Sequence, residues 1–363
     1  MGSDGGPERR AVDDGPNGRQ EEGGWRLTGS LEEFLTAGGA YLRSRPALHT
    51  VALTVSDALG RRGLDLYGDE PPRFGWRAVS GEVSAVLLWT PPHVPMVVGG
   101  DEAAARGLAR VLAEGEGPAP GGVGAPVEQA RAFAGEWART TGQATRRTFR
   151  KRLYRLGGLH RPALPPGRAR SAGEADRATL ERWHDGFAAD VGATVGLGAA
   201  AWVDAGLARG GIRLWEDGGR PVAMAVATLP VAGSVRVTTV YTPPVLRGRG
   251  YAGAVTADLS ARVTAGGDEA VLFTDVANPT SNGLYCRLGY EPLAEFEEYA
   301  FGAGRGEGSL QERPTVSLGP PRPSRSGRLP SRPLRIGPAD VADGGAAAPV
   351  WAESGPPGRL SAQ

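Results

Sequence analysis

The sequence predicts an α/β protein with a mixed β-sheet. Apolar runs of strand length alternate with longer segments of helical spacing, and each half of the chain contains an antiparallel hairpin. In the second half a Gly-rich turn also joins a buried strand to a helix. The proline-rich residues 162–167 divide the chain, and the elements on either side follow a comparable order.

The first half alternates helices with strands. In chain order we expect a helix over 31–44, a strand over 49–55, a hairpin with strands at 73–78 and 82–89, a strand over 94–98, helices over 101–113 and 127–140, and a strand over 144–156. Asp101 is the expected N-cap of its helix, because its side chain can accept a hydrogen bond from a backbone N–H of the first turn.

The second half starts with helices and ends with a strand. In chain order we expect helices over 174–189 and 199–208, a hairpin with strands at 212–215 and 222–228, a strand over 235–241, a helix over 250–264, a strand over 271–274, a helix over 281–287 and a strand over 298–301.

Composition limits the class of protein. The chain has 363 residues, enough for two domains, and much of its excess of Gly and Pro lies toward the two ends, which we expect to be disordered. The net charge of +1 gives no general attraction to nucleic acid or anionic membranes, and no apolar run is long enough to span a bilayer. Cys286 is the only cysteine, which excludes an intrachain disulfide and favours a reducing compartment. With no signal-peptide pattern, we expect a soluble, cytoplasmic protein.

The most informative motif is R-G-R-G-Y-A, from Arg247 to Ala252, which follows an apolar strand and opens a helix. A helix N-terminus carries backbone N–H groups without a helical partner, and its dipole favours negative charge. Glycine at positions 248 and 250 lets the backbone approach a ligand closely. The motif therefore predicts a site for a phosphate-bearing ligand.

The same residues also satisfy G-x-G-x-x-G, beginning at Gly248, and Asp275 ends the next strand. That pattern is typical of a Rossmann dinucleotide site, in which the first glycine directly follows the strand. Here residues 242–247 intervene, and Pro243 and Pro244 make the exit from the strand irregular. This position disfavours the Rossmann interpretation. A plain Gly-rich loop is the other alternative.

A second polar cluster narrows the choice of ligand. The segment N-P-T-S-N-G-L-Y ends at Tyr285, and L-G-Y ends at Tyr290. Together with R-x-x-G-x-A beginning at Arg247, these motifs resemble the Gcn5-related N-acetyltransferase (GNAT) family, whose members move an acetyl group from acetyl-coenzyme A (acetyl-CoA) to an amine. The resemblance implies the acyl-CoA N-acyltransferase fold. It is specific over residues 235–290 and weaker over 174–228.

Composition and the resemblance together indicate how the chain is divided. We expect a disordered tail over 1–25, a degenerate GNAT-like half over 26–165, the N-acetyltransferase domain over 166–303, and a disordered tail over 304–363. The first half has G-G-D ending at Asp101 where the second has its glycine turn, so we expect a tandem pair whose first copy is inactive. An unrelated N-terminal α/β domain is the alternative, and the strand orders of the two halves discriminate between them.

Roles for individual residues follow from the same resemblance. The residues that it assigns to the donor site are Val240, Tyr241, Thr242, Arg247, Gly248, Arg249, Gly250, Tyr251, Ala252, Asn278 and Ser281. Tyr285 matches the general acid of the family, which protonates the departing thiolate of coenzyme A, a group whose pKa is near a thiol's value of about 8.5. An ordinary core tyrosine is the alternative for Tyr285.

The general base is not evident. Many members of the family carry a glutamate on the strand that corresponds to residues 235–242, and this chain has no carboxylate there. Asp190 and His184 are candidates, because they fall in the helical region that often lines the acceptor pocket in this family. Glu216 and Asp217 belong to a hairpin turn, where we expect them to be solvated. A base acting through a chain of waters stays open.

The other reactive or charged residues do not indicate a cysteine nucleophile, a metal site or a nucleic-acid site. Cys286 follows Tyr285 on a helix, which turns neighbouring side chains about 100° apart, so we expect it to be a small buried side chain and the acetyl transfer to be direct, in a ternary complex. The four histidines lack metal-ligand spacing. The basic run from Arg146 to Arg152 suggests nucleic acid, but its alternation with apolar residues favours a solvated arginine-rich strand.

The sequence therefore predicts an N-acetyltransferase that uses acetyl-CoA, holds no metal and acts on a small-molecule or peptide amine, with neither nucleic acid nor membrane as a partner. The identity of the amine, the preferred acyl chain and the oligomeric state stay open. A non-catalytic module that binds or senses acyl-CoA is one alternative, favoured by the missing carboxylate. An NAD(P)-binding oxidoreductase is the other, and it predicts stabilisation by the dinucleotide.

Overall fold

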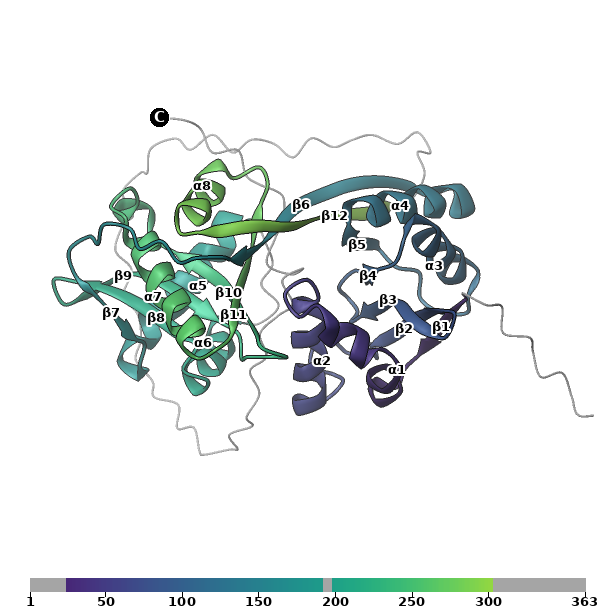
Figure 1. Ribbon diagram of the computed structural model, residues 1–363, viewed down its shortest axis with the longest axis horizontal. Helices are drawn as coiled ribbons and strands as arrows, with labels where there is room; N and C mark the ends of the chain where they lie inside the picture. The colour runs from purple at the N-terminus through teal and green to yellow at the C-terminus, as the bar shows by residue number, and fades with distance from the viewer. Residues whose placement is uncertain (1–23, 192–197, 303–363) are drawn as a thin grey trace, which may run out of the picture.

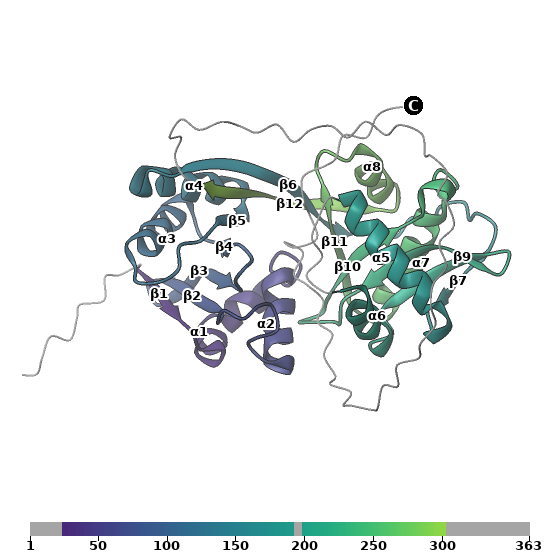
Figure 2. The ribbon, with the colours of Figure 1, turned by 180° about the vertical axis from the view of Figure 1, so that it is seen from behind.

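The computed structural model describes residues 24–191 and 198–302, so nearly all of the tails expected at 1–25 and 304–363 lies outside it. Within these ranges the strands form one twelve-stranded sheet, in the order β1-β2-β3-β4-β5-β12-β6-β11-β10-β9-β8-β7. Helices cover both of its faces (Figures 1 and 2). The predicted mixed α/β sheet is confirmed. None of the described helices is long and apolar enough to cross a membrane.

Ten elements make up the N-terminal half. They are β1 (Trp25–Thr28), α1 (Leu31–Ser44), α2 (Thr50–Arg62), β2 (Arg73–Val79), β3 (Glu82–Trp89), β4 (Met96–Gly99), α3 (Glu102–Glu114), β5 (Gly122–Pro126), α4 (Val127–Thr141) and β6 (Ala144–Leu156). Asp101 is the N-cap of α3, as predicted, and its carboxylate accepts a hydrogen bond of 2.7 Å from the Ala104 N–H.

The C-terminal half repeats this order. Its elements are β7 (Arg168–Ser171), the short 3₁₀ helix η1 (Glu174–Asp176), α5 (Arg177–Val191), α6 (Ala199–Ala208), β8 (Ile212–Asp217), β9 (Arg220–Ala227), β10 (Ser234–Tyr241), the 3₁₀ helix η2 (Pro244–Leu246), α7 (Tyr251–Ala265), β11 (Glu269–Asp275), α8 (Pro279–Arg287) and β12 (Tyr290–Gly302). Apart from the two short 3₁₀ helices, each element corresponds in type and order to one in the first half.

The two halves exchange their last strands. From one edge of the sheet, strands β1 to β5 of the N-terminal half are followed by β12, the last strand of the C-terminal half. From the other edge, strands β7 to β11 of the C-terminal half are followed by β6, the last strand of the N-terminal half. The exchanged strands also pair with each other, antiparallel, from Tyr290 opposite Leu156 to Gly302 opposite Ala144. Figure 1 shows β6 and β12 running side by side between the halves. The halves therefore have the same strand order, and each completes the sheet of the other.

One predicted strand is wrong. Residues 49–55 begin α2 instead, with His49 as its N-cap. The β-branched residues suggested a strand, but Val51, Val55 and Leu59 repeat at helical spacing and are buried in one apolar cluster. Packing of that face outweighs the local preference. The short strands β1, β5 and β7 and most of β12 were not predicted, because their β-propensity is weak or mixed.

The basic run lies on β6, opposite acidic residues of β12. Glu295 accepts hydrogen bonds of 2.8 Å from Nε of Arg150 and from Nε of Arg152. Glu297, on the same strand, is completely buried and pairs with Arg147 at 3.0 Å. The arginines of this strand are therefore matched by carboxylates rather than only solvated, which weakens the nucleic-acid interpretation further.

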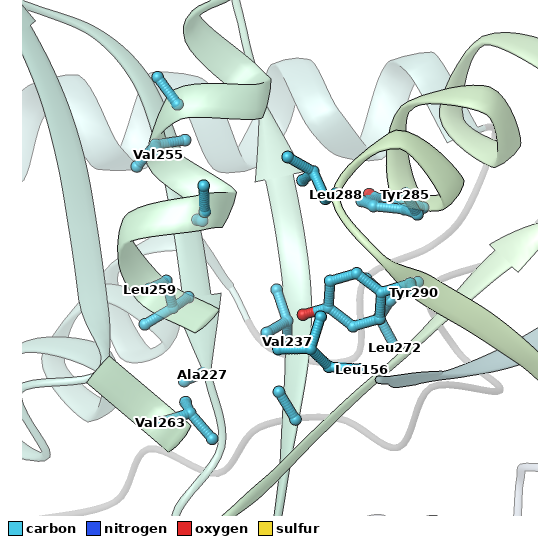
Figure 3. Packing of buried hydrophobic residues seen from close by; sticks show 14 of the residues in the cluster. Leu156, Ala227, Val237, Val255, Leu259, Val263, Leu272, Tyr285, Leu288 and Tyr290 are labelled. Atoms are coloured by element: carbon cyan, nitrogen blue, oxygen red, sulfur yellow. The ribbon is translucent and has the colours of Figure 1, made fainter. Parts of the chain in front are cut away.

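The core of the C-terminal half lies between α7 and the sheet. Val255, Leu259 and Val263 of α7 belong to one buried cluster with Tyr285 and Tyr290 (Figure 3). A second cluster, built on α5 and α6, lies on the opposite face of the same strands and includes Trp183, Trp202 and Tyr241. Both faces of β10 are thus covered, and the position of its C-terminal end is determined by packing.

Candidate functional site

Two neighbouring parallel strands separate at the centre of the C-terminal half. β10 and β11 are in register from Ser234 opposite Glu269 to Val237 opposite Leu272, and no further pair follows in the described residues. Beyond that point β10 stays paired with β9, and β11 stays paired with β6 as far as Asp275. The facing edges of the two strands therefore carry backbone groups that have no partner in the ladder. Such an open edge can accept an extended ligand with amide groups.

The separated part of β10 also contains a β-bulge. Its register against β9 shifts between Val237 and Val240 and then continues with Tyr241 opposite Met224. A bulge leaves one residue outside the ladder and redirects the neighbouring backbone groups. The predicted site residues Val240, Tyr241 and Thr242 thus lie where β10 has left β11.

The glycine turn connects this strand end to α7. Its N-terminal part is η2, in which the Arg247 N–H donates to the Pro244 carbonyl at 3.2 Å. Gly248 and Gly250 follow with φ of 77° and 85°, values that favour glycine. A methyl group built on Gly248 would meet no atom within 4 Å, so this side of the turn is open.

The N-terminus of α7 has no side-chain cap. Gly250 is its N-cap residue, and the first helical bond runs from the Ala254 N–H to the Gly250 carbonyl at 3.0 Å. The N–H groups of Tyr251, Ala252 and Gly253 consequently have no acceptor within the helix. Together with the open side of the turn, these groups fit a diphosphate.

The two arginines of the turn have different surroundings. The Arg247 Nε–H donates to the Thr242 carbonyl at 3.0 Å, and its guanidinium forms an ion pair with Asp190 of α5. The exposed Arg249 donates to the Val245 carbonyl over 3.4 Å and also interacts with the Tyr251 side chain. Of the two side chains, Arg249 is the one placed to contact a ligand on the turn.

Tyr251 fastens the start of α7 to the β8–β9 hairpin. Its hydroxyl donates to Asp217 Oδ2 at 2.5 Å, and this bond raises the pKa of Tyr251 above its usual value. Asp217 was expected to be a solvated turn residue, and it accepts this bond instead. The contact holds in place the residue that directly follows Gly250.

Asn278 and Ser281 lie at the N-terminus of α8, beyond the end of β11. Asn278 is the N-cap of α8, and its side-chain oxygen accepts a hydrogen bond of 3.0 Å from the Ser281 N–H. Asn282, which the sequence analysis did not single out, ties the segment together: its amide donates to the carbonyls of Asp275 and Asn278 at 2.7 Å each. Asn278 and Ser281 thus lie just after the part of β11 that has separated from β10.

Tyr285 is buried in the core beneath this segment. It is 8% exposed, and its ring packs edge-on against Tyr290 with 6.0 Å between centroids (Figure 3). Burial, with a smaller contribution from Tyr290, raises the pKa of Tyr285 well above its usual value. The phenol is protonated at neutral pH, and the raised pKa also makes it a weaker acid than an exposed tyrosine.

The candidate bases are engaged elsewhere. Asp190 is ion-paired with Arg247, and Glu216 with Arg170 at 2.6 Å. His184 is 4% exposed, its ring lies beside Trp202, and its Nδ1 is 3.1 Å from Asp185. The structure thus adds no support to a direct carboxylate base.

Cys286 was predicted to be buried, and this is wrong. It is exposed, because α8 turns Tyr285 toward the core and the next side chain away from it. Its Sγ lies 4.0 Å from the Tyr154 hydroxyl, which in turn donates to Asn282 at 2.8 Å. Among the described residues, no group of three or more His, Cys, Asp or Glu side chains could hold a metal ion.

The corresponding region of the N-terminal half is built differently. Gly100 and Asp101 alone join β4 to α3, and the Asp101 carboxylate occupies the helix N-terminus. The Gly100 carbonyl accepts a bond of 2.8 Å from the Gln129 side chain. A methyl group built on Gly99 would lie 1.7 Å from the Tyr41 hydroxyl, so a side chain already fills the space over the end of β4.

Comparison with known proteins finds a family model that spans this region. Residues 219–299, which hold the separated strands, the glycine turn and α8, match the family model described as FR47-like protein. Many solved structures have a similar fold, among them a Drosophila structural-genomics target (TM-score 0.52, 16% identity, covering 78% of this chain and 100% of that one). A GNAT acetyltransferase from Colwellia psychrerythraea follows with TM-score 0.49 and 11% identity, covering 77% of this chain and 99% of that one.

The C-terminal half of the chain resembles the GNAT family. A tandem GNAT protein from the clavulanic acid biosynthesis pathway is also similar, with TM-score 0.47 and 12% identity, covering 78% of this chain and 100% of that one. The predicted GNAT resemblance is confirmed, and the comparisons support the prediction of an acyltransferase. At these identities the likeness to the solved structures concerns the GNAT fold. A search of curated proteins found no match.

Proposed function

We propose that the chain is an N-acetyltransferase that transfers an acetyl group from acetyl-CoA to an amine by direct attack in a ternary complex. The observation that carries this proposal is the open edge of β10 directly beside a glycine turn and an uncapped helix N-terminus. One feature suits the amides of a pantetheine arm, and the other suits a diphosphate. Coenzyme A contains both groups in one molecule.

Each part of the donor has residues that would hold it. The N–H groups of Tyr251 and Ala252, with the guanidinium of Arg249, would bind the diphosphate. The unpaired edge of β10 beyond Val237 would bind the pantetheine amides. Acetyl-CoA supplies the activated thioester, and the Tyr285 hydroxyl would give its proton to the departing sulfur.

We further propose that residues 166–303 form the catalytic unit and residues 26–165 a copy that does not bind acetyl-CoA. The capping of α3 by Asp101 and the Tyr41 side chain over Gly99 support this assignment. Titration calorimetry with acetyl-CoA is therefore expected to give one site per chain. Two sites per chain would contradict the assignment, and no heat with any coenzyme A species would contradict the proposed donor.

The role of Tyr285 is tested by release of free coenzyme A thiol with a panel of amines. Replacing Tyr285 with Phe is expected to lower kcat about 10²- to 10⁴-fold, the usual contribution of a general acid, with little change in the affinity for acetyl-CoA. Tyr290→Phe is the matched control, since it removes a phenol hydroxyl from the same cluster, one bonded to Ser260. Equal turnover in the two variants would show that Tyr285 is not the acid.

A further inference from the structure

One face of α5 lies against the exit of β10. Trp183, Gly186 and Asp190 are spaced along that face, three and four residues apart. The Trp183 ring is 6.1 Å from the Tyr241 ring, and a methyl group built on Gly186 would be 2.4 Å from the Tyr241 hydroxyl. Asp190, one turn further along, reaches Arg247. A single helix thus contacts both the last residue of β10 and the glycine turn.

Arg247 is held by groups on three sides. Its Nε–H donates to the Thr242 carbonyl at 3.0 Å, its guanidinium lies 6.0 Å from the centroid of the Tyr241 ring, and Asp190 supplies the counter-charge. These contacts direct the side chain toward β10 and α5. The Arg247 N–H is also committed, to the Pro244 carbonyl. Arg247 is therefore occupied in fixing the shape of the turn.

The position of Asp190 has an electrostatic cost for the proposed donor. A carboxylate beside a diphosphate site repels the ligand, so it weakens binding unless it does something that compensates. Its contact with Arg247 is partly exposed, with 39% of the Asp190 side chain accessible, so its contribution to stability is small. The main effect of this contact is instead on the position of the turn relative to α5.

We propose that Asp190 and Arg247 form a clamp that positions the donor-binding turn against α5. Asp190 is then a positioning residue and not the general base, and Arg249 is the arginine left for the phosphates. The identity of the ligand in this proposal rests on the proposed function, whereas the contacts between Asp190 and Arg247 do not. It predicts that binding at the turn and the order of the last turn of α5 depend on each other.

The direction in which one substitution changes the affinity for acetyl-CoA distinguishes the clamp from simple charge repulsion. Asp190→Asn keeps the shape and removes the charge, and the clamp predicts that acetyl-CoA then binds about fivefold more weakly, the upper range for an exposed ion pair. Loss of a repelling charge alone predicts tighter binding. Asp185→Asn is the matched control, because it removes the same charge from the same helix, where Asp185 contacts His184 and not the turn. Asp190→Glu, which keeps the charge, is expected to restore most of the affinity.

Hydrogen exchange tests the clamp without any ligand. Asp190→Asn and Arg247→Gln are each expected to speed exchange in the last turn of α5, the double variant no more than either single one, and Asp185→Asn not at all. If Asp190→Asn behaves like Asp185→Asn in both affinity and exchange, the clamp is refuted. Loss of turnover in Asp190→Asn with unchanged affinity and exchange would make Asp190 a base and also overturn it. Absence of acetyl-CoA binding by the unmodified protein would refute the proposed function, whereas the exchange experiment would still decide the clamp.

Discussion

Glu297→Gln tests whether the exchanged strands make the two halves one cooperative unit. Glu297 lies on β12 and is 0% exposed, and its carboxylate accepts hydrogen bonds from Arg131 of α4 at 3.1 and 3.2 Å and from Arg147 of β6 at 3.0 Å. Burial alone would raise the pKa of Glu297, yet the two arginines hold it below its usual value. Glutamine keeps the size of the side chain but places a neutral amide against these two guanidinium groups and that of Arg150, 3.9 Å away.

The expected loss follows from these contacts. Removing a fully buried ion-pair partner costs about 3–5 kcal/mol, and a hydrogen bond to a charged group is worth about 1.5–3 kcal/mol. Here the Arg131 and Arg147 side chains are 47% and 50% exposed, so water can solvate them once the charge is gone. We therefore expect a smaller loss of unfolding free energy, about 2 kcal/mol, which for a single cooperative unit of this size corresponds to a fall in Tm of about 3–4 °C.

Urea unfolding, followed by tryptophan fluorescence and by circular dichroism, measures this loss. Glu295→Gln is the matched control on the same strand, because its side chain is 23% exposed and its arginine partners also reach solvent, so we expect about 1 kcal/mol. The unmodified protein is expected to show one transition with both probes. Equal losses in the two variants, or separate transitions for the two halves, would refute the argument.

Two further predictions concern the turn and pH. Gly250→Ala places an alanine at a φ of 85°, which costs about 1 kcal/mol and displaces the first N–H groups of α7, so calorimetry is expected to show acetyl-CoA bound about tenfold more weakly. Gly142→Ala, at a φ of 73° at the end of α4, is expected to cost similar stability without changing that affinity. The arginine-paired carboxylates of Glu295 and Glu297 have lowered pKa values in the folded state, so their stabilisation is complete above their usual value of 4.5 and is lost as pH falls below it. Unfolding free energy that stays level in urea titrations from pH 6 to pH 3 would contradict this.

Much of the candidate site could be predicted because its chemistry is local. Gly248 and Gly250 take up positive φ within a single turn, and a helix N-terminus presents its N–H groups whatever surrounds it. The Asn278 cap likewise depends on a contact only three residues away. For these features the order of residues along the chain already specifies the geometry.

Contacts between distant segments could not be predicted in this way. The pairing of the arginines on β6 with Glu295 and Glu297 joins residues about 150 positions apart. The ion pair between Asp190 and Arg247, and the bond from Tyr251 to Asp217, depend equally on how helices and hairpins pack. No spacing within one element signals them, which is why Asp217 was predicted to be a solvated residue.

By itself the sequence determined the alternation of helices and strands, the glycine turn and the polar start of α8, since periodicity and backbone preference act over a few residues. Only the tertiary structure decided that β6 and β12 change places, that residues 49–55 are helical and that Cys286 faces outward. The physical reason is that strand pairing and burial are set by contacts with remote parts of the chain, and their summed free energy outweighs local preference.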